Sequence, residues 1–239
     1  HKHRRRQRQM CIRDRSLLVE KFQYTKLKRT TVEGKRFYVG ENGNAVPSVT
    51  TILGATKDMT ALNEWKRRVG KAEAQRIVTE SANLGTVTHS HLENYITGQP
   101  RPSGGNMVYQ EAKKLSDIII DKGLSKVDEV WAIEQNLCFP NLYAGTADMV
   151  CVWNGQPVIG DFKTSRKVKK KEWIEEYFMQ CAAYALAHNE VYGTDINAGL
   201  IFIVSHSGEY QQFLVEKAEF RKYNDMWLDK VEQFYKIAK

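Results

Sequence analysis

The spacing of hydrophobic and polar residues changes near the middle of the chain. Residues 61–81 have apolar side chains near one helical face and basic side chains away from it, which predicts an amphipathic helix. From residue 127 onward, apolar runs of strand length follow one another, and these runs predict a sheet. The apolar face of the first helix carries Leu62, Trp65, Val69, Ala72 and Ile77.

Turn and cap residues indicate where the predicted elements begin and end. Ser48 is a candidate N-cap, Gly85 is placed at the start of a helix, and Gly123 is placed at the end of one. Gly70 weakens the helix around it without breaking it, and Asn154-Gly155 predicts a tight hairpin turn. Helices are predicted at 47–53, 61–81, 85–96, 107–122, 172–190 and 220–237, a loop at 98–105, and strands at 37–39, 127–139, 143–153, 157–164, 198–204 and 210–215.

This order of elements predicts an α/β fold in which a mixed central β-sheet is flanked by helices and preceded by an N-terminal helical region. The 239 residues contain no linker rich in Pro, Gly or Ser, so we expect residues 16–239 to form a single domain. The longest apolar run, residues 198–204, has the length of a buried strand. We therefore expect a soluble protein with no membrane partner.

Charge is distributed unevenly along the chain. The net charge is +8, but residues 1–15 carry seven basic side chains against Asp14, a net +6, which leaves +2 for the other 224 residues. Residues 1–15 have no apolar periodicity and are expected to be disordered. They can be interpreted as a basic arm that grips phosphates, as an Arg-rich transit peptide, or as translated sequencing-adapter sequence, which residues 9–16 resemble. We favour the third interpretation, so residues 1–15 are not expected to contribute to the fold or the function.

Cysteines are few and have no C-x-x-C spacing. Cys151 and Cys181 lie in apolar periodic segments, which favours packed thiols over disulfides or metal ligands. Free thiols indicate that the protein works in a reducing compartment. We therefore expect a cytoplasmic location in a bacterial or phage-infected cell rather than a mitochondrial one. The other two cysteines are Cys11 and Cys138.

Two carboxylates and one ammonium are predicted to meet at one edge of the sheet. Side chains of a strand alternate between faces, so Asp161 and Lys163 point the same way while Phe162 points into the opposite layer. Asp148 ends a motif on the neighbouring predicted strand. Burying such groups is unfavourable unless they are paired, and a divalent cation held by the carboxylates is the simplest explanation.

Other polar residues are spaced so that they can reach the same place. His89 and Glu93 lie four residues apart on one helical face, whereas His91 points elsewhere. Glu134 falls on the polar face of its strand together with Asn136. Three alternatives stay open: a buried structural histidine for His89, a residue that only fixes the histidine tautomer for Glu93, and a solvated strand residue for Glu134.

Five motifs follow one another along the chain. Their order resembles that of the RecB-type branch of the PD-(D/E)xK nuclease superfamily, over roughly residues 45–190. Within that branch, the runs at 47–53, 85–93 and 161–165, with Trp65 between the first two, are most similar to the mitochondrial genome maintenance exonucleases and their phage relatives. The motifs are Gly85-x-x-x-His89, Glu134, Gly145-x-x-Asp148, Asp161-x-Lys163 and Gln180-x-x-x-Tyr184.

The resemblance implies a restriction-endonuclease-like core and metal-dependent hydrolysis of DNA. It implies that Asp148, Asp161, the backbone carbonyl of Phe162 and His89 hold Mg²⁺ or Mn²⁺, with Glu93 and Glu134 as accessory residues. Lys163 would orient or deprotonate the attacking water, or neutralise the phosphate, with a pKa that can fall near a metal and apolar walls. In relatives, a pair such as Gln180 and Tyr184 touches the substrate backbone and braces the lysine.

A basic loop follows the predicted lysine. It gives a local cluster of positive charge whose contact with phosphates would make binding salt-sensitive, although a solvated loop is the alternative. Trp173 and Tyr177 follow the loop, where they can stack on unpaired bases or pack into the core. The residues of this segment predicted to contact substrate are Thr164, Ser165, Arg166 and Lys167.

The sequence also departs from some members of the resembled branch. Nothing after Cys181 is a cysteine, so we expect no iron-sulfur cluster, and no G-x-x-x-x-G-K-[ST] helicase motif occurs. We predict a Mg²⁺- or Mn²⁺-dependent DNA exonuclease acting on single strands or frayed ends in replication, recombination or genome turnover, with proteins of those processes as further partners and a phage gene as one source. A structure-directed endonuclease and a catalytically silent nucleic-acid-binding module are the alternatives.

Overall fold

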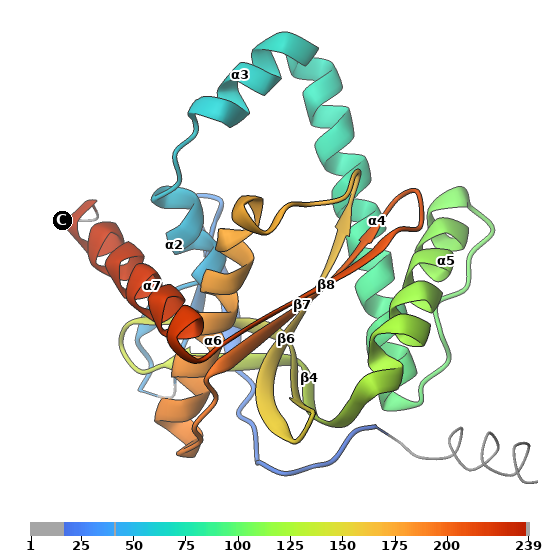
Figure 1. Cartoon of the computed structure of the whole chain (residues 1–239). Coiled ribbons are helices and arrows are strands. Elements are labelled where there is room, and N and C mark those ends of the chain that lie inside the picture. Colours follow the sequence, from blue (N-terminus) through green and yellow to red (C-terminus); the bar gives the residue numbers. More distant parts are fainter. Residues whose placement is uncertain (1–16, 41, 238–239) are drawn as a thin grey trace, which may run out of the picture.

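A five-stranded mixed sheet forms the centre of the protein (Figure 1). The computed structural model describes residues 17–40 and 42–237, so the segment 1–15 with its predicted disorder, and Cys11 within it, lie outside the described residues. The strands lie in the order β4-β5-β6-β7-β8, in which β6 and β7 are parallel and the other neighbours are antiparallel. The strand bounds are β4 Val127–Phe139, β5 Tyr143–Trp153, β6 Gln156–Ser165, β7 Ala198–Ser205 and β8 Tyr210–Glu216.

Helices cover both faces of this sheet, which confirms the predicted α/β class. Helices α4 and α5 pack on one face around a core that includes Phe162 and Phe202. Helices α2, α6 and α7 pack on the other face around Ile159 and Ile201. Burying both faces removes a large apolar area from water, the dominant favourable term in folding. The helices are α2 Val49–Ala55, α3 Thr60–Val69, α4 Lys71–Thr97, α5 Met107–Lys122, α6 Glu175–Tyr192 and α7 Lys217–Ile237, with short 3₁₀ turns η1 Leu124–Lys126 and η2 Lys171–Trp173.

A second, smaller sheet precedes the helices. Strands β1 Lys28–Val32, β2 Lys35–Val39 and β3 Ala45–Pro47 form an antiparallel sheet. Only the middle strand was predicted, so the expected N-terminal helical region in fact begins with a sheet. The charged, largely exposed residues of β1 give no alternating apolar signal in the sequence. The predicted cap is confirmed, because the side chain of Ser48 accepts a hydrogen bond from the Thr51 backbone N–H at the start of α2.

Two glycine predictions were wrong. Gly70 breaks the predicted helix of residues 61–81, because it adopts φ 86° and ψ 148°, a conformation open to glycine and outside the helical region. Gly85 does not start a helix but lies inside α4, which runs for 27 residues from Lys71 to Thr97. Glycine lowers helix stability without forbidding the helical conformation. Packing against the sheet therefore determines whether the helix continues through a glycine.

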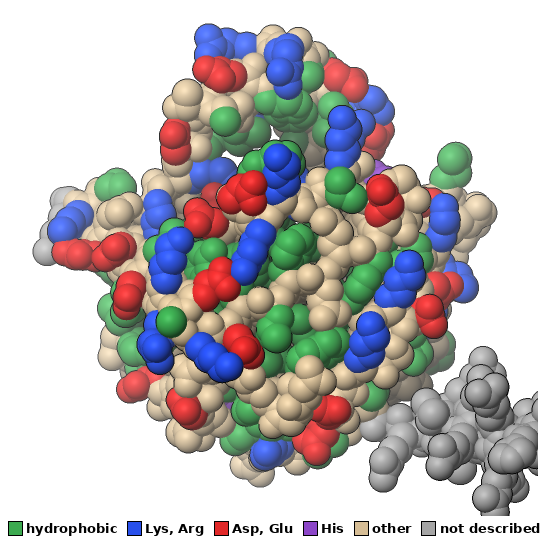
Figure 2. All heavy atoms as spheres, in the orientation of Figure 1, with side chains coloured by type: hydrophobic (Ala, Val, Ile, Leu, Met, Phe, Trp, Pro, Cys, Tyr) green, Lys and Arg blue, Asp and Glu red, His purple; other side chains and the backbone are tan. Residues whose placement is uncertain are grey.

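Helix α3 and residues 71–83 of α4, here called the arch, stand off from the body of the protein (Figure 1). None of the residues of α3 is buried. One base of the arch is held by an ion pair of 2.8 Å between Lys57 and Glu176 and by a hydrogen bond of 2.8 Å from Lys230 Nζ to the Thr56 carbonyl. Figure 2 shows hydrophobic side chains gathered on the underside of the arch. The arch therefore leaves apolar side chains such as Trp65 and Val78 half-buried or exposed.

Other predictions from spacing are confirmed. Gly123 ends α5, and Asn154 and Gly155 both have positive φ, at 50° and 74°, as the hairpin turn requires. Cys151 and Cys181 are buried free thiols, and burial raises the pKa of both. Across the described ranges, no helix is both long enough and apolar enough to cross a bilayer.

His188 gives a testable pH dependence. It is fully buried on α6, with Nε2 3.0 Å from the Tyr24 hydroxyl and Nδ1 2.7 Å from the Thr194 hydroxyl. Burial lowers the pKa of His188 from 6.5 to about 4, so the unfolded chain binds the extra proton between these two values. Stability is therefore full above pH 6.5 and falls as the pH drops toward 4, by at most about 3 kcal/mol.

Urea unfolding at pH 7, 5.5 and 4.5 measures this loss. We expect His188→Gln to lower stability at pH 7 but to flatten its fall at acid pH, because glutamine has no proton to gain. An equally steep fall in both proteins would assign the acid sensitivity to other groups.

Candidate active site

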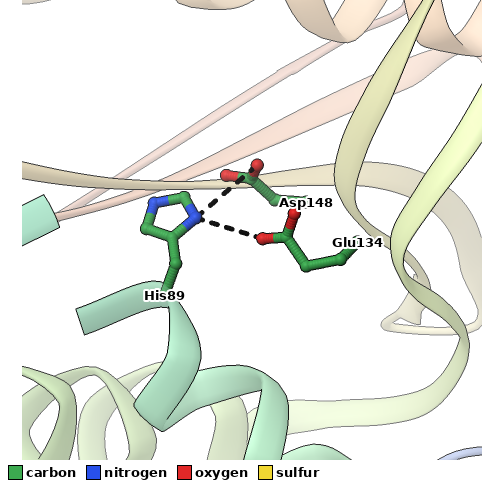
Figure 3. Close-up of side chains that lie close together, drawn as sticks. All are labelled: His89, Glu134 and Asp148. Atoms are coloured by element: carbon green, nitrogen blue, oxygen red, sulfur yellow. Dashed lines mark hydrogen bonds and ion pairs between the residues drawn. The ribbon is translucent and has the colours of Figure 1, made fainter. Parts of the chain in front are cut away.

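Five polar side chains from four elements converge beside the central sheet. Asp148 comes from β5, Asp161 and Lys163 from β6, His89 from α4 and Glu134 from β4. Figure 3 shows the carboxylates of Asp148 and Glu134 pointing toward the His89 ring. The predicted sharing of one face by Asp161 and Lys163 is confirmed, since both line one cavity while Phe162 packs into the opposite core.

His89 links α4 to the strands. Its Nε2 donates a hydrogen bond of 2.9 Å to the Phe162 carbonyl, while Nδ1 lies 3.3 Å from Glu134 Oε1 and 3.8 Å from Asp148 Oδ1. Burial alone would lower the pKa of His89, but Asp148 and Glu134 raise it to about 9. The cluster therefore attracts positive charge strongly enough to outweigh desolvation.

Asp161 and Lys163 form a short, mostly buried ion pair. Their Oδ1 and Nζ atoms lie 2.6 Å apart, and the Asp161 side chain is only 6% exposed. Burial raises the pKa of Asp161 to about 7; Lys163 opposes this rise and Asp148 adds to it. Burial would lower the pKa of Lys163, but the two aspartates raise it above its usual value. Two carboxylates therefore outweigh burial at Lys163, and the fall in pKa near a bound metal stays a prediction.

This arrangement fits a divalent cation. His89, Glu134 and Asp148 each offer a ligand atom, and these atoms lie within 4.8 Å of one another. The Oδ2 atom of Asp161 is buried and has no hydrogen-bond partner among the described residues. Carboxylate oxygens suit hard cations such as Mg²⁺ and Mn²⁺, and an imidazole nitrogen shifts the preference toward Mn²⁺. Asp148 is held in place by a hydrogen bond of 2.8 Å from the Phe162 backbone N–H to Oδ2.

Glu134, a member of this cluster, and Glu93 both line one cavity beside α4. Glu134 has φ 47°, an uncommon conformation for a residue other than glycine, and its carboxylate faces His89. Glu93 is half-buried, and burial together with Glu134 raises its pKa. His91 points elsewhere, as predicted, and its Nδ1 accepts a hydrogen bond from Arg101.

Gln180 and Tyr184 line the cavity of about 210 Å³ that contains Asp148, Asp161 and Lys163. Gly145 lets Tyr184 approach, because a Cβ atom on this glycine would lie 2.8 Å from Tyr184 Cε1. A side chain at residue 145 would therefore displace the tyrosine ring.

We expect Gly145→Ala to lower activity at least tenfold and stability by about 1 to 3 kcal/mol, because the overpacked ring must move. Gly85→Ala is the matched control: its Cβ would meet Thr164 Oγ1 at 3.6 Å, an ordinary contact. Kinetics and thermal unfolding of both variants measure the difference. Equal activity and stability of the two variants would show that neither quantity depends on the position of the Tyr184 ring.

The basic loop begins directly after β6. Arg166 and Lys167 are exposed, whereas Ser165 is buried and its hydroxyl donates to the Lys167 carbonyl at 2.6 Å, which shapes the loop. Trp173 is 63% exposed, with Lys170 Nζ 5.2 Å from its ring centre. A single ring that projects into solvent beside a cation is available to a ligand.

Tyr177 is more enclosed than Trp173. It is partly buried, and Lys163 Nζ lies 5.0 Å from its ring centre. It thus packs against the site lysine instead of projecting into solvent. Thr164, at the start of the loop segment, is half-buried close to Gly85 of α4.

Comparison with known proteins finds no matching family model. The chain is 28% identical over 207 residues to mitochondrial genome maintenance exonuclease 1 of Mus musculus, covering 80% of this chain and 59% of that protein. It is 25% identical over 213 residues to the Homo sapiens protein of the same name, covering 80% and 58%. The chain thus spans less than two thirds of these curated relatives. Its sequence similarity is to nucleases.

Solved structures resemble the protein only distantly. A structure from Eubacterium rectale, described provisionally as an exonuclease, has 12% identity and a TM-score of 0.48 over 64% of each chain. An alkaline exonuclease from Laribacter hongkongensis has 9% identity and a TM-score of 0.29, covering 81% of this chain and 91% of that one.

The structure places Glu134, an accessory candidate from the sequence, in the group of three possible ligands with His89 and Asp148. Asp161 lies outside that group and pairs with Lys163. The predicted alternation of β4 failed, since bulges shift its register near Val130 and Ala132. A bulge leaves no reliable signal in a single sequence.

Proposed function

We propose that this protein is a Mg²⁺- or Mn²⁺-dependent deoxyribonuclease that degrades DNA from free ends, in replication, recombination or genome turnover. The observation that carries the proposal is the cation-sized group of His89, Glu134 and Asp148 beside the Asp161–Lys163 pair. Hydrolysis of a phosphodiester adds water across one P–O bond, and the anionic transition state needs positive charge nearby. The site supplies both a place for a cation and a fixed ammonium.

Each residue has a proposed part in that chemistry. A bound divalent cation supplies a nucleophilic water at neutral pH and offsets phosphate charge. Asp148, Glu134, His89 and the free oxygen of Asp161 would hold it. Lys163 would orient or deprotonate the attacking water, or neutralise the phosphate.

The choice of DNA and of an exonuclease draws on the relatives. Both curated relatives are exonucleases by name, and the shared segment covers 80% of this chain. Arg166 and Lys167 add positive charge beside the site, where phosphates would displace counterions. These features favour DNA over a small phosphate ester.

The arch supports a preference for free, unpaired ends. One base is held on α6 and α7, and the other continues into the part of α4 that carries His89 (Figure 1). A strand that passes beneath such a bridge must enter by an end. Exposed and half-buried apolar side chains of the arch, including Trp65, offer stacking surfaces that paired bases cannot use.

End-labelled linear single strands and closed circles, incubated with and without Mn²⁺, test the proposed function. We expect progressive shortening of the linear strand only, and only with the cation. Equal cutting of circles would favour a structure-directed endonuclease on the same core. Binding without any shortening would favour a catalytically silent nucleic-acid-binding module.

Trp65 provides a further prediction. Trp65→Ala should weaken binding of single strands about tenfold, because stacking of one base contributes about 1 to 3 kcal/mol. Trp65→Phe should restore most of this loss, and duplex binding should change little in either variant. Fluorescence anisotropy measures the affinities, and equal losses for duplex and single strand would contradict a stacking role.

A further inference from the structure

Three cavities lie in a row across the candidate active site. The cavity beside α4, about 360 Å³, shares Glu134 with the 210 Å³ cavity that contains Asp148, Asp161 and Lys163. The latter shares Arg36 and Thr50 with a third cavity of about 460 Å³, between the β1–β2 hairpin and α2. The three cavities therefore adjoin one another, and this row, here called the track, has the cavity of Asp148, Asp161 and Lys163 in its middle.

The two ends of this track differ in charge. The α4 end is lined by His89, Glu93 and Glu134 with hydroxyl and glycine neighbours, so its wall offers a polyanion no arginine or lysine. The α2 end is lined by Lys35, Arg36 and hydroxyl groups, with no carboxylate in its wall. A nucleic-acid strand held in the catalytic cavity would therefore continue toward α2.

The backbone of Arg36 is fixed at the junction of the second and third cavities. Its N–H donates to Thr51 Oγ1 at 3.1 Å, and its carbonyl accepts from Thr51 Oγ1 and from the Ser48 N–H, both at 2.9 Å. Tyr38 follows Arg36 by two residues on β2, and its hydroxyl lies 3.0 Å from Thr146 Oγ1. Thr146 belongs to β5, the strand that also carries Asp148. The strand of Arg36 is thus tied to the strand of a metal-ligand candidate.

The guanidinium of Arg36 has no ion pair or hydrogen bond within the part of the chain that the structure describes. Arg36 is exposed and lines the cavity of Asp161 and Lys163, and a guanidinium there is suited to phosphate, whose oxygens it can bind with two parallel hydrogen bonds.

We propose that Arg36, with Lys35 and the Thr50 hydroxyl, binds the sugar–phosphate backbone of the substrate strand next to the bond that is cut. This inference rests on the proposed nuclease function and adds the direction in which the strand leaves the catalytic cavity. The ligand is an internal phosphodiester, not the terminal phosphate of an end. Arg36 positions the strand, and it takes no part in the bond-breaking step.

Neutral methylphosphonate linkages, placed one at a time along a single strand, test the proposal. Dissociation constants are measured in Lys163→Ala protein, which keeps the strand intact, with and without Arg36→Ala. We expect one linkage near the cut to weaken binding about tenfold when Arg36 is present and to have no effect when it is absent. Arg36→Ala should also reduce the slope of log affinity against log salt by about 0.7, the value for one phosphate on a single strand.

Two controls separate this subsite from general electrostatics. Arg221→Ala, which removes an exposed arginine from α7, should keep the full effect of that linkage. Arg36→Lys keeps the charge and should recover only part of it, because an ammonium cannot bind two phosphate oxygens in parallel. If Arg36→Ala retains the linkage effect at every position, or if only a terminal phosphate matters, the subsite proposal is wrong. If the wild-type protein does not shorten DNA at all, the proposed function fails first.

Discussion

Asp148→Asn will abolish divalent-cation binding and reduce DNA hydrolysis on the order of a thousandfold, equal to about 4 kcal/mol of transition-state stabilisation. The asparagine oxygen can still accept the hydrogen bond from the Phe162 N–H, so the strand geometry should remain. The substitution removes the negative charge of the Asp148 carboxylate, whose Oδ1 lies 3.8 Å from His89 Nδ1. The loss is therefore one of cation affinity and not of folding.

Thermal unfolding in two conditions distinguishes these causes. Without metal, Asp148→Asn should change stability only modestly, because it removes repulsion with Asp161 but also the attraction that raises the pKa of His89 and of Lys163. With Mn²⁺ at a hundred times its dissociation constant, the wild type should gain about 2.7 kcal/mol and the variant nothing. An equal gain in both proteins would place the cation away from Asp148.

Lys163→Met should also remove activity by about a thousandfold, but for a different reason. Methionine keeps the length of the stem and removes the ammonium, which leaves Asp161 buried without its partner. Breaking such a pair costs about 3 kcal/mol, reduced here because the pKa of Asp161 already lies at about 7 and the acid can take up a proton.

The double variant Lys163→Met/Asp161→Asn separates stability from catalysis. It removes both charges, so stability should recover to within about 1 kcal/mol of the wild type, because a buried ion pair contributes little over neutral groups of similar shape. Activity should not recover. Urea unfolding and single-turnover kinetics measure the two quantities, and a recovery of activity would show that neither charge takes part in the reaction.

The sheet was predictable because its strands carry long uninterrupted signals. The predicted ranges 127–139 and 143–153 match β4 and β5 at both ends, and Asn154-Gly155 gave the turn after them. Strand alternation then placed Asp161 and Lys163 together. Local periodicity and turn chemistry were sufficient wherever a strand was buried and regular.

The arch and the small N-terminal sheet were not predictable in the same way. A glycine can break a helix or lie within it, and at Gly70 and Gly85 only the tertiary contacts decide which happens. Strand β1 is held by pairing with β2 and not by an apolar face, so its sequence looks like a loop. Arg36 lies in this overlooked region, which explains why the sequence did not suggest it as a substrate contact.

The most direct test of the account is a time course of end-labelled linear single-stranded DNA with wild-type and Asp148→Asn protein, each with Mn²⁺ and with chelator. We expect progressive shortening of the DNA in one of the four reactions, that of the wild type with Mn²⁺. Shortening by the wild type in chelator, or by Asp148→Asn at the wild-type rate, would contradict a cation-dependent nuclease site built around Asp148.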